Sequence, residues 1–363
     1  MSSVRQQPSV TVLDRSARDS RSICPLVVIG SGNVGGELLQ LLDDRRPGSV
    51  SLLGLANSRT MLWNELGLSL DGIRQQLAES DQASCLDELA SRLLDQGPQG
   101  VIVDLTASRE VADRHAGWIQ AGLDVVTANK WAAAGEAQGY QALLGAEEAG
   151  VGRYRHATTV GAGLPLLDSL QRLRSAGESI VSVSGLFSGT LSYLMQGLQS
   201  GRGLAKSLWA AHEQGLTEPD PRLDLSGLDV ARKLVITARA AGFELSLEDV
   251  RIESLVPPSL IDCDLSTFFA QGSEPLDSHW AGIQSKAEAG IPRYVGQVDN
   301  QGQASVGIQW LPTAHPFVGV GATDNIFEIR SDSYRDTPLI IRGPGAGSRV
   351  TAVQVLADIH SLI

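Results

Sequence analysis

Four carboxylates and a lysine stand close together in the run GLTEPDPRLDLSGLDVARK, residues 215–233. Glu218, Asp220, Asp224 and Asp229 fall within twelve residues, and Lys233 follows Asp229 by four positions. Carboxylates can hold a cationic group, and a lysine whose pKa is pulled toward neutrality can take up and release a proton. The run therefore predicts a polar pocket for a small charged substrate, unless it is a solvated loop that leads into a helix, as charge runs commonly are.

The spacing of this run should bring two of these groups together. Asp229 and Lys233 are four residues apart in LDVARKLVITARA, so on a helix they share one face and can form an ion pair. Pro219 and Pro221 restrict the backbone of the preceding loop, which would hold the other carboxylates in place with little motion. We therefore expect a rigid acidic loop followed by a carboxylate–amine pair.

Composition restricts the classes to which the chain can belong. Its 363 residues, 42% of them hydrophobic, suffice for two domains with substantial cores. The formal net charge of −12 argues against nucleic acid or an anionic membrane surface as a partner, and no apolar run approaches the ~18 residues of a membrane helix. Cys24, Cys85 and Cys263 are widely separated, which favours reduced thiols in a cytoplasmic protein over a disulfide framework or a zinc site. Residues 1–22 lack an apolar stretch, and we interpret them as a disordered leader rather than a signal peptide.

A strand, a glycine-rich turn and a helix are predicted in ICPLVVIGSGNVGGELLQLLDD, residues 23–44. Gly30, Gly32 and Gly35 form the pattern G-x-G-x-x-G, with Asn33 and Val34 inside it. In this context the glycines permit a tight turn, close approach of a pyrophosphate and close strand–helix packing, while the helix N-terminus faces the phosphates. The segment therefore predicts a dinucleotide site.

The residues after the next strand bear on which dinucleotide is bound. SVSLLGLAN predicts a strand that ends near residue 57, where proteins that prefer NAD usually carry Asp or Glu for the ribose 2′-hydroxyl. This chain has Asn57 and Arg59 there instead. Because a guanidinium group bonds phosphate in bidentate fashion, we expect NADP(H) as the preferred cofactor, with NAD(H) as the alternative.

Two further apolar runs place polar residues at the carboxyl ends of strands, where open α/β sheets bind ligands. GVIVDLTAS, residues 100–108, reads as a parallel strand covered on both faces, and it ends in Thr106 and Ser108. A helix over roughly residues 109–121 leads to LDVVTANK, which places Asn129 and Lys130 just beyond a strand. We expect Thr106, Ser108 and Lys130 near the nicotinamide end of the cofactor; the alternative for Lys130 is a solvated loop.

From about residue 166 the pattern changes to a helix, the strand SIVSVSGLF, another helix, and strand-like runs at RYVGQV, ASVGIQWL, NIFEIRS and TPLIIRG. A second glycine-rich turn containing Gly345 precedes a terminal helix, and we expect its backbone near the cofactor unless it is simply a connection. The predicted fold is α/β: a Rossmann-type dinucleotide-binding domain (residues 23–165 and 340–363) and an α/β substrate and dimerisation domain (residues 166–339) with a mostly antiparallel sheet.

In their order along the chain, these stretches resemble the homoserine dehydrogenase family. The resemblance rests on GNVGG, ANSR, VDLTAS, VVTANK, TVGAGLP, GLFSGTLSYL, TEPDPRLDLSGLDVARK and GPGAGSRVTA, and it runs from about residue 26 to 360. The acidic run is the most specific of them, whereas the glycine turn alone is not. The similarity is greatest to the dehydrogenase portion of bifunctional aspartokinase–homoserine dehydrogenases, although we expect no kinase domain here and no regulatory domain that would confer threonine inhibition.

The resemblance implies an activity and roles for the charged residues. The activity is the reversible NADPH- or NADH-dependent reduction of L-aspartate 4-semialdehyde to L-homoserine, on the route to threonine and methionine. It further implies that Glu218 and Asp224 bind the substrate and that Asp229 and Lys233 lie at the reacting end. We expect Lys233 to be the general acid/base and Lys130 to orient the substrate or relay the proton, and these two roles could be exchanged.

The resemblance also implies contacts made by smaller residues. Gly189 and Thr190 match residues that border the substrate, although Thr190 as the N-cap of the following helix is an equally good explanation. A monovalent cation such as sodium would be bound by the backbone carbonyls of Val160, Ala162 and Leu164.

The chain departs from the family pattern at three positions. Ala157 stands where the family often has an acidic residue, so the cation site would depend on carbonyls and water. Leu216 and Leu223 replace a Tyr and an Asp. Leu216 and Leu223 keep open the alternative of an NADP-dependent oxidoreductase of another small amino or hydroxy acid. A non-catalytic dinucleotide sensor is a third hypothesis, against which Lys130, Asp229 and Lys233 count, because a sensor needs no proton-transfer groups. Relatives are usually homodimers joined through the substrate domain, and we expect the same here.

Overall fold

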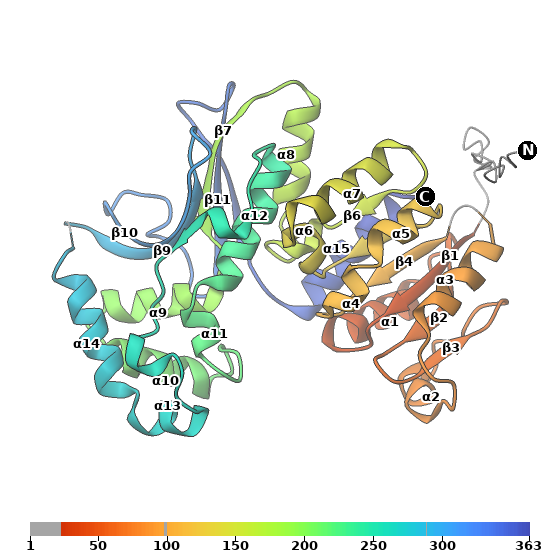
Figure 1. Ribbon diagram of the computed structural model, residues 1–363, viewed down its shortest axis with the longest axis horizontal. Helices are drawn as coiled ribbons and strands as arrows, with labels where there is room; N and C mark the ends of the chain where they lie inside the picture. Colours follow the sequence, from red (N-terminus) through yellow and green to blue (C-terminus); the bar gives the residue numbers. More distant parts are fainter. Residues whose placement is uncertain (1–22, 98–99, 288) are drawn as a thin grey trace, which may run out of the picture.

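The computed structural model describes residues 23–97, 100–287 and 289–363, so the predicted leader at residues 1–22 lies outside the described residues. The chain forms two lobes, each built on a six-stranded sheet (Figure 1). The predicted α/β fold with two sheets is confirmed.

The first sheet is parallel apart from one edge strand. Its order is β3-β2-β1-β4-β5-β6, and only β3 runs antiparallel to its neighbour. The central strands are buried on both faces, which explains why their sequences are almost continuously apolar. The strands are β1 Cys24–Ile29, β2 Val50–Ala56, β3 Met61–Trp63, β4 Val101–Asp104, β5 Asp124–Thr127 and β6 Tyr154–Arg155.

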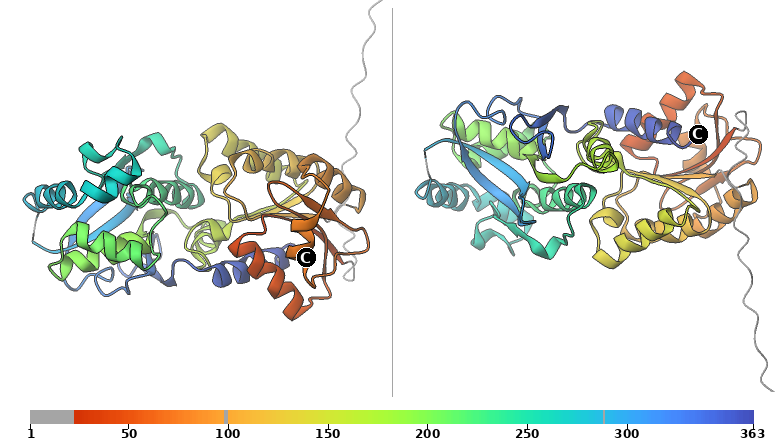
Figure 2. Two further views of the ribbon diagram at one scale, coloured as in Figure 1. Left: turned by 90° about the horizontal axis from the view of Figure 1, so that it is seen from below. Right: turned by 90° about the horizontal axis from the view of Figure 1, so that it is seen from above.

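Helices cover both faces of this sheet (Figure 2). One face packs against α1 (Asn33–Arg45), α2 (Ile73–Glu79) and the C-terminal α15 (Ser348–His360). The other packs against α3 (Leu86–Asp95), α5 (His115–Gln120) and α7 (Ala137–Glu148). The helix predicted over 109–121 is interrupted: α4 (Arg109–Ala112) and α5 are separate, and the second begins where the His115 side chain turns inward to Asp104. Short α6 (Trp131–Ala134) and the 3₁₀ turn η1 (Ala157–Thr159) follow β5 and β6.

The second sheet has the order β12-β11-β7-β9-β10-β8 and is antiparallel except for the β10–β8 pair, as predicted. The strands are β7 Ile180–Leu186, β8 Val250–Ile252, β9 Ile291–Val298, β10 Ala304–Leu311, β11 Asp324–Ser331 and β12 Leu339–Pro344. Because β12 pairs with β11, the boundary expected at residue 340 falls inside a strand, and the chain crosses to the first lobe only in the glycine-rich turn before α15.

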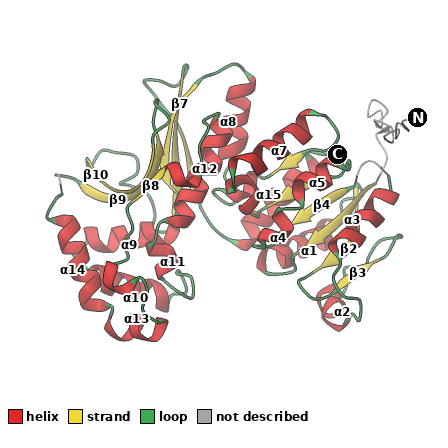
Figure 3. Ribbon diagram, in the orientation of Figure 1, coloured by secondary structure: helices red, strands yellow, loops and turns green. Residues whose placement is uncertain are grey.

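Helices pack on the second sheet and share its main core (Figure 3). They are α8 Leu166–Ser175, α9 Gly189–Gln199, α10 Leu204–Glu213, α11 Arg222–Leu225, α12 Leu228–Ala241, α13 Leu265–Gln271 and α14 Ser273–Gln284, with the 3₁₀ turns η2 Leu247–Asp249 and η3 Pro258–Leu260. Among the described helices, none is long and apolar enough to cross a bilayer.

The position of α12 is fixed by its sequence at both ends and along one face. Gly227 and Gly242 flank it with φ of +73° and +95°, a left-handed conformation that glycine adopts without steric cost. Between them, the first turns of the helix bury one side in the core, and the stretch from Leu234 to Arg239 is buried all round. The start of α12 at Leu228 determines where Asp229 and Lys233 lie.

The C-terminal helix contains a buried acid that should make stability depend on pH. Asp358 is 4% exposed, and its Oδ2 has no hydrogen-bond partner in the described part of the chain. Gln354 donates to Asp358 Oδ1 at 3.2 Å and to Asp168 Oδ2 at 3.5 Å. Burial, and then the charge of Asp168, raises the pKa of Asp358 to about 7.

This raised pKa predicts that Asp358→Asn stabilises the protein at high pH. The unfolded chain releases this proton near its usual pKa of ~4, whereas the folded state keeps it up to about pH 7, so stability falls between about pH 4 and 7 and the penalty is complete above pH 7. The amide mimics the protonated acid, so we expect a rise in Tm at pH 8 that largely disappears at pH 5, measured by scanning calorimetry. Asp95→Asn, at an exposed end of α3, is the control for loss of one negative charge. An equal rise at both pH values would contradict the assignment.

Candidate active site

One carboxylate lies between two ammonium groups at the junction of the lobes. Asp229 Oδ2 is 2.8 Å from Lys233 Nζ on the same helix, and its Oδ1 is 3.5 Å from Lys130 Nζ. Lys130 follows β5 of the first sheet and is the N-cap residue of α6. The Asp229–Lys233 pair is thus joined by a cation from the other lobe. Burial acts to raise the pKa of Asp229, but Lys233 and Lys130 hold it well below its usual range.

The two lysines differ in how they are held. The Lys233 side chain is 15% exposed and donates a second hydrogen bond, 3.0 Å long, to the Phe187 carbonyl at the end of β7. The Lys130 side chain is 35% exposed and contacts Asp229 alone among polar groups of the described chain. An ammonium fixed by two acceptors keeps its third N–H for a ligand, so Lys233 can deliver or hold a proton at a defined point.

The acidic loop before α12 forms a second part of the site. Asp224 Oδ2 accepts a 2.8 Å hydrogen bond from the Glu218 backbone N–H, and burial raises the pKa of Asp224. The Glu218 side chain is exposed, with no hydrogen bond or ion pair to the rest of the described chain. Thr190 donates to the Leu216 carbonyl at 2.6 Å, so the loop is joined to the start of α9. The loop thus combines one internally bonded carboxyl group with one that can take a ligand cation.

Asp220, the remaining carboxylate of the run, has a structural role. It forms a 2.7 Å ion pair with Arg222, whose guanidinium also donates to the carbonyls of Leu260 and Cys263. Local spacing did not separate this carboxylate from the others, because the carbonyls that hold its partner Arg222 lie on the 260–263 segment, which is remote in the chain. These bonds anchor the loop to the 260–263 segment.

The substituted leucines lie at the edges of this loop. Leu223 is 58% exposed, whereas Leu216 is partly buried against the core of the second lobe. Neither adds a polar group to the site.

A cleft of about 530 Å³ lies next to these groups without including them. It is lined by Trp131 and Arg232, the chain neighbours of Lys130 and Lys233, and the Arg232 guanidinium lies 4.7 Å from the Trp131 ring centroid. Because the lysines and Asp229 do not line this cleft, the charged constellation rather than the cleft identifies the reacting site.

The first glycine-rich turn has the geometry that a dinucleotide requires. A Cβ at Gly35 would lie 2.0 Å from the Gly30 carbonyl oxygen, and one at Gly30, where φ is +103°, would lie 2.9 Å from Leu105. A Cβ at Gly32 would instead meet nothing within 4 Å, so this glycine faces open space in front of α1. No side chain caps α1, which leaves the N–H groups that begin at Asn33 and Val34 for a ligand.

Two guanidinium groups beyond β2, one after the strand and one on α2, can bind a ligand. Asn57 accepts from the backbone N–H groups of Arg59 and Thr60 at 2.7 and 2.9 Å, so its side chain shapes the turn. The exposed Arg59 guanidinium makes no hydrogen bond or ion pair to residues that the structure describes. Arg74 of α2, which sequence reasoning missed, lies over the first turn of α1, with Nη1 3.2 Å from the position of a Cβ on Gly36. Its distance in sequence from the glycine motif gave no signal.

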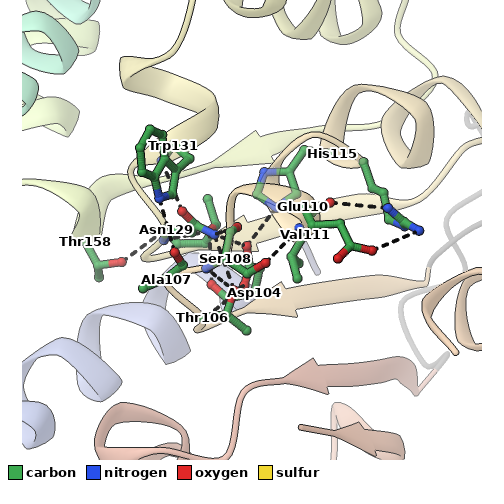
Figure 4. A network of polar contacts seen from close by, with 12 residues as sticks. Asp104, Thr106, Ala107, Ser108, Glu110, Val111, His115, Asn129, Trp131 and Thr158 are labelled. Carbon is green, nitrogen blue, oxygen red and sulfur yellow. Dashed lines mark hydrogen bonds and ion pairs between the residues drawn. The ribbon is translucent and has the colours of Figure 1, made fainter. Parts of the chain in front are cut away.

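A buried carboxylate organises the carboxyl edge of β4 and β5 (Figure 4). Asp104 is fully buried and accepts hydrogen bonds from the Thr106 hydroxyl (2.7 Å) and Asn129 Nδ2 (2.9 Å), with His115 Nε2 at 3.0 Å. Ser108 Oγ caps α4 by accepting from the N–H of Val111. Thr106 and Ser108 are thus at the expected sheet edge, but their hydroxyl groups serve the loop, and β4 ends at Asp104 rather than at residue 108. Asp104 and His115 were missed, although an Asp at the end of an apolar strand was a usable signal.

The start of α9 corrects one interpretation. Its N-cap is Ser188, whose Oγ accepts from the Leu191 N–H at 3.2 Å, so Thr190 as the cap is wrong. The Thr190 hydroxyl turns to the acidic loop instead. Gly189 lies close to the Thr323 backbone, where a Cβ would be 3.4 Å from the carbonyl oxygen.

The second glycine-rich turn packs against a buried amide. A Cβ at Gly345 would lie 2.0 Å from Asn325 Oδ1, so this glycine makes room for Asn325. The turn leads directly into α15, which also has no side-chain cap. Whether Gly345 contacts a cofactor stays a prediction.

The segment expected to bind a cation has a strained backbone. Ala162 has φ of +55°, an uncommon conformation for a residue with a Cβ, and such strain is concentrated at functional sites. The Leu164 carbonyl accepts from the Leu166 N–H at 2.8 Å, whereas the carbonyls of Val160 and Ala162 receive no backbone hydrogen bond from the described chain. The described side chains form no group of three or more His, Cys, Asp or Glu suited to a metal. Any cation here would rely on the backbone, in line with Ala157.

Comparison with known proteins assigns the two lobes to a common family. Residues 30–157 match the family model "Homoserine dehydrogenase, NAD binding domain", and residues 165–360 match the model "Homoserine dehydrogenase". Among solved structures, a hyperthermophilic archaeal homoserine dehydrogenase in complex with NADPH has a TM-score of 0.72 over 94% of this chain and 97% of its own, with 21% identity, and supports the fold.

Two curated relatives show how much of a longer protein the chain can represent. It is 36% identical to a chloroplastic bifunctional aspartokinase/homoserine dehydrogenase of Zea mays, over 99% of this chain but only 41% of the maize protein. It is 34% identical to the homoserine dehydrogenase of Paracoccidioides brasiliensis, over 93% of this chain and 97% of the fungal protein. The resemblance inferred from the sequence is confirmed, and the chain belongs to the homoserine dehydrogenase family.

Proposed function

We propose that this chain catalyses the reversible NAD(P)H-dependent reduction of L-aspartate 4-semialdehyde to L-homoserine, within threonine and methionine biosynthesis. The observation that carries the proposal is Asp229 held between Lys233 and Lys130, next to an acidic loop and the carboxyl edge of a dinucleotide-type sheet. A relative of similar length and the family models support the activity, whereas the bifunctional relatives are more than twice as long.

The substrate ammonium would be held by the acidic loop. Glu218 offers an exposed carboxylate, and Asp224 supports it by accepting from the Glu218 N–H. Gly189 and Thr190 border the same loop from the start of α9. Attraction between the Glu218 carboxylate and the substrate ammonium would orient the amino acid and leave its side-chain oxygen directed away from the loop.

Lys233 and Lys130 would carry out the proton transfer. The nicotinamide supplies or accepts the hydride. Lys233, fixed by Asp229 and the Phe187 carbonyl, gives a proton to the aldehyde oxygen during reduction and takes it from the hydroxyl group during oxidation. Lys130 orients the same oxygen or relays the proton, and Asp229 keeps both amines in position by its charge.

The cofactor would lie across the first glycine-rich turn, with the open face of Gly32 and the uncapped start of α1 toward its phosphates. We propose a preference for NADP(H), because the guanidinium groups of Arg59 and Arg74 have no internal partners in the described chain. The archaeal relative in complex with NADPH supports this choice. The remaining contacts would come from Gly30, Asn33, Val34, Gly35, Asn57, Thr106, Ser108, Lys130 and Gly345.

Further features follow from the same proposal. We propose that residues 23–165 together with the C-terminal α15 form the dinucleotide-binding domain, and that the segment from residue 166 to the end of β12 binds substrate and joins two copies into a homodimer. A monovalent cation such as sodium would bind the carbonyls of the 160–164 segment, and the protein would act in the cytoplasm.

A second candidate function is that of an oxidoreductase of another small amino or hydroxy acid, which the exposed Leu223 on the acidic loop favours.

The activity predicts a specific effect of removing Lys233. With homoserine and NADP, the wild-type protein should raise absorbance at 340 nm, and Lys233→Ala should lower kcat by about 10²–10⁴-fold, the usual contribution of a positioned acid/base. The dissociation constant for NADPH, measured by fluorescence titration, should stay nearly unchanged, because in the described chain the polar partners of the Lys233 side chain are Asp229 and the Phe187 carbonyl. Assays with and without sodium test the cation in the same experiment.

Lys206→Ala, at an exposed position of α10, is the matched control and should retain full activity. Equal loss of turnover and NADPH affinity in Lys233→Ala would mark a structural lysine. A wild-type protein that binds NADPH but ignores homoserine would favour the second candidate, and a panel of small aldehydes would then identify its substrate class.

Coenzyme preference should depend on Arg59. Arg59→Asp removes a guanidinium group and adds a carboxylate suited to a ribose 2′-hydroxyl, so the Kd for NADPH should rise by about 10- to 100-fold, as expected for loss of roughly 1.5–3 kcal/mol in a charged hydrogen bond. The Kd for NADH should change little or fall. Arg251→Asp, on the exposed edge strand β8, changes the net charge equally and should leave the NADPH/NADH ratio unaltered. Parallel weakening of both cofactors would contradict the assignment.

A further inference from the structure

The carbonyl that holds Lys233 is shared with a second donor. Phe187 lies between β7 and the Ser188 cap of α9, and its oxygen accepts from Lys233 Nζ at 3.0 Å. The same oxygen accepts from Nδ2 of Asn325 at 3.4 Å. A carbonyl oxygen has two lone pairs, so the two donors together fix the position of this oxygen.

Asn325 is a buried amide with one polar atom that has no partner in the described chain. It lies on β11, is 1% exposed, and its Oδ1 has no hydrogen-bond partner in the described chain. The amide cannot be turned around, because Oδ1 would then face the Phe187 carbonyl and two acceptors would repel each other. A buried polar atom without a partner costs stability, so such an atom in a folded protein calls for an explanation.

The backbone around Asn325 is arranged to accept this amide. Asn325 is paired with Gly343 on β12, and a Cβ at Gly345 would lie 2.0 Å from its Oδ1 and 2.6 Å from its Nδ2. Any side chain at residue 345 would therefore displace the amide. The register of β11 against β7 sets Ile326 opposite Leu186, so the strand pairing itself brings Asn325 next to Phe187.

We propose that Asn325 is a positioning residue for the acid/base lysine and acts through the Phe187 carbonyl. The inference rests on the proposed function, since it assumes that Lys233 moves the proton. Lys233 has three N–H donors, of which Asp229 and Phe187 accept two. The direction of the third is set by those two acceptors, so a shift of the Phe187 oxygen redirects the N–H that faces the substrate oxygen. Asn325 prevents that shift.

The test compares Asn325→Leu and Asn325→Ala with the wild-type protein, using homoserine and NADP. We expect kcat to fall by about tenfold or more, since small misplacement of a catalytic group is costly. The solvent deuterium isotope effect on kcat should increase, because the proton step becomes slower. The Kd for NADPH should stay within about twofold, because in this proposal the amide acts on Lys233 rather than on the cofactor.

Two further variants keep the result interpretable. Gly345→Ala should push the Asn325 amide aside and reproduce the larger isotope effect, even if the Leu variant folds poorly. Gln196→Leu removes another side-chain amide, one that donates to the Val320 carbonyl at 2.7 Å in the same lobe, and should leave the isotope effect unchanged.

The outcomes separate the inference from the proposed function. Loss of NADPH affinity without a change in isotope effect would make Asn325 a cofactor contact, and a lower Tm with unaltered kcat would make it purely structural; either result overturns the inference. A wild-type protein inactive on homoserine would overturn the proposed function itself. An active wild-type protein whose Asn325 variants keep normal kcat would overturn the inference alone.

Discussion

The ion contacts of Asp229 are the interaction on which the site depends. The ammonium groups of Lys130 and Lys233 would repel each other, and the Asp229 carboxylate between them attracts both and so holds them in place. Because Lys130 comes from the first lobe and Lys233 from the second, the same carboxylate joins the dinucleotide-type sheet to the acidic loop. Both lysines keep the Asp229 carboxylate ionised, because they hold its pKa well below the usual range, against the effect of burial.

This arrangement is precise because α12 contacts the first lobe at several points along one side. Asp229 reaches Lys130, Arg232 packs over the Trp131 ring, and Arg239 donates to the Ala133 carbonyl at 2.8 Å. These contacts meet three residues of one short segment, Lys130, Trp131 and Ala133. A rotation of α12 would break all of them together, so the orientation of the reacting pair is coupled to the packing of the lobes.

Local patterns in the sequence predicted the parts of the site that depend on nearby residues. The Asp229–Lys233 pair and the strand–glycine–helix unit follow from spacing along one element, and both lie where they were expected. Contacts between remote segments could not be predicted in this way: Lys130 with Asp229, Asp220 anchored through Arg222 to the 260–263 segment, and His115 with Asp104. The N-cap of α9 was misplaced because Ser188 and Thr190 have equal capping chemistry, and only the tertiary demand of the acidic loop for the Thr190 hydroxyl separates them.

The two glycine-rich turns show why a motif alone does not distinguish ligand approach from internal packing. Gly30 and Gly35 are required by their own backbone neighbours, and Gly345 is required by the Asn325 amide. Of the described glycines in these two turns, Gly32 alone would place a Cβ in open space, so the absence of a Cβ there serves no contact within the described protein. Because Gly32 also stands at the uncapped start of α1, a phosphate could approach the backbone N–H groups there, and this position rather than the whole motif supports a bound phosphate.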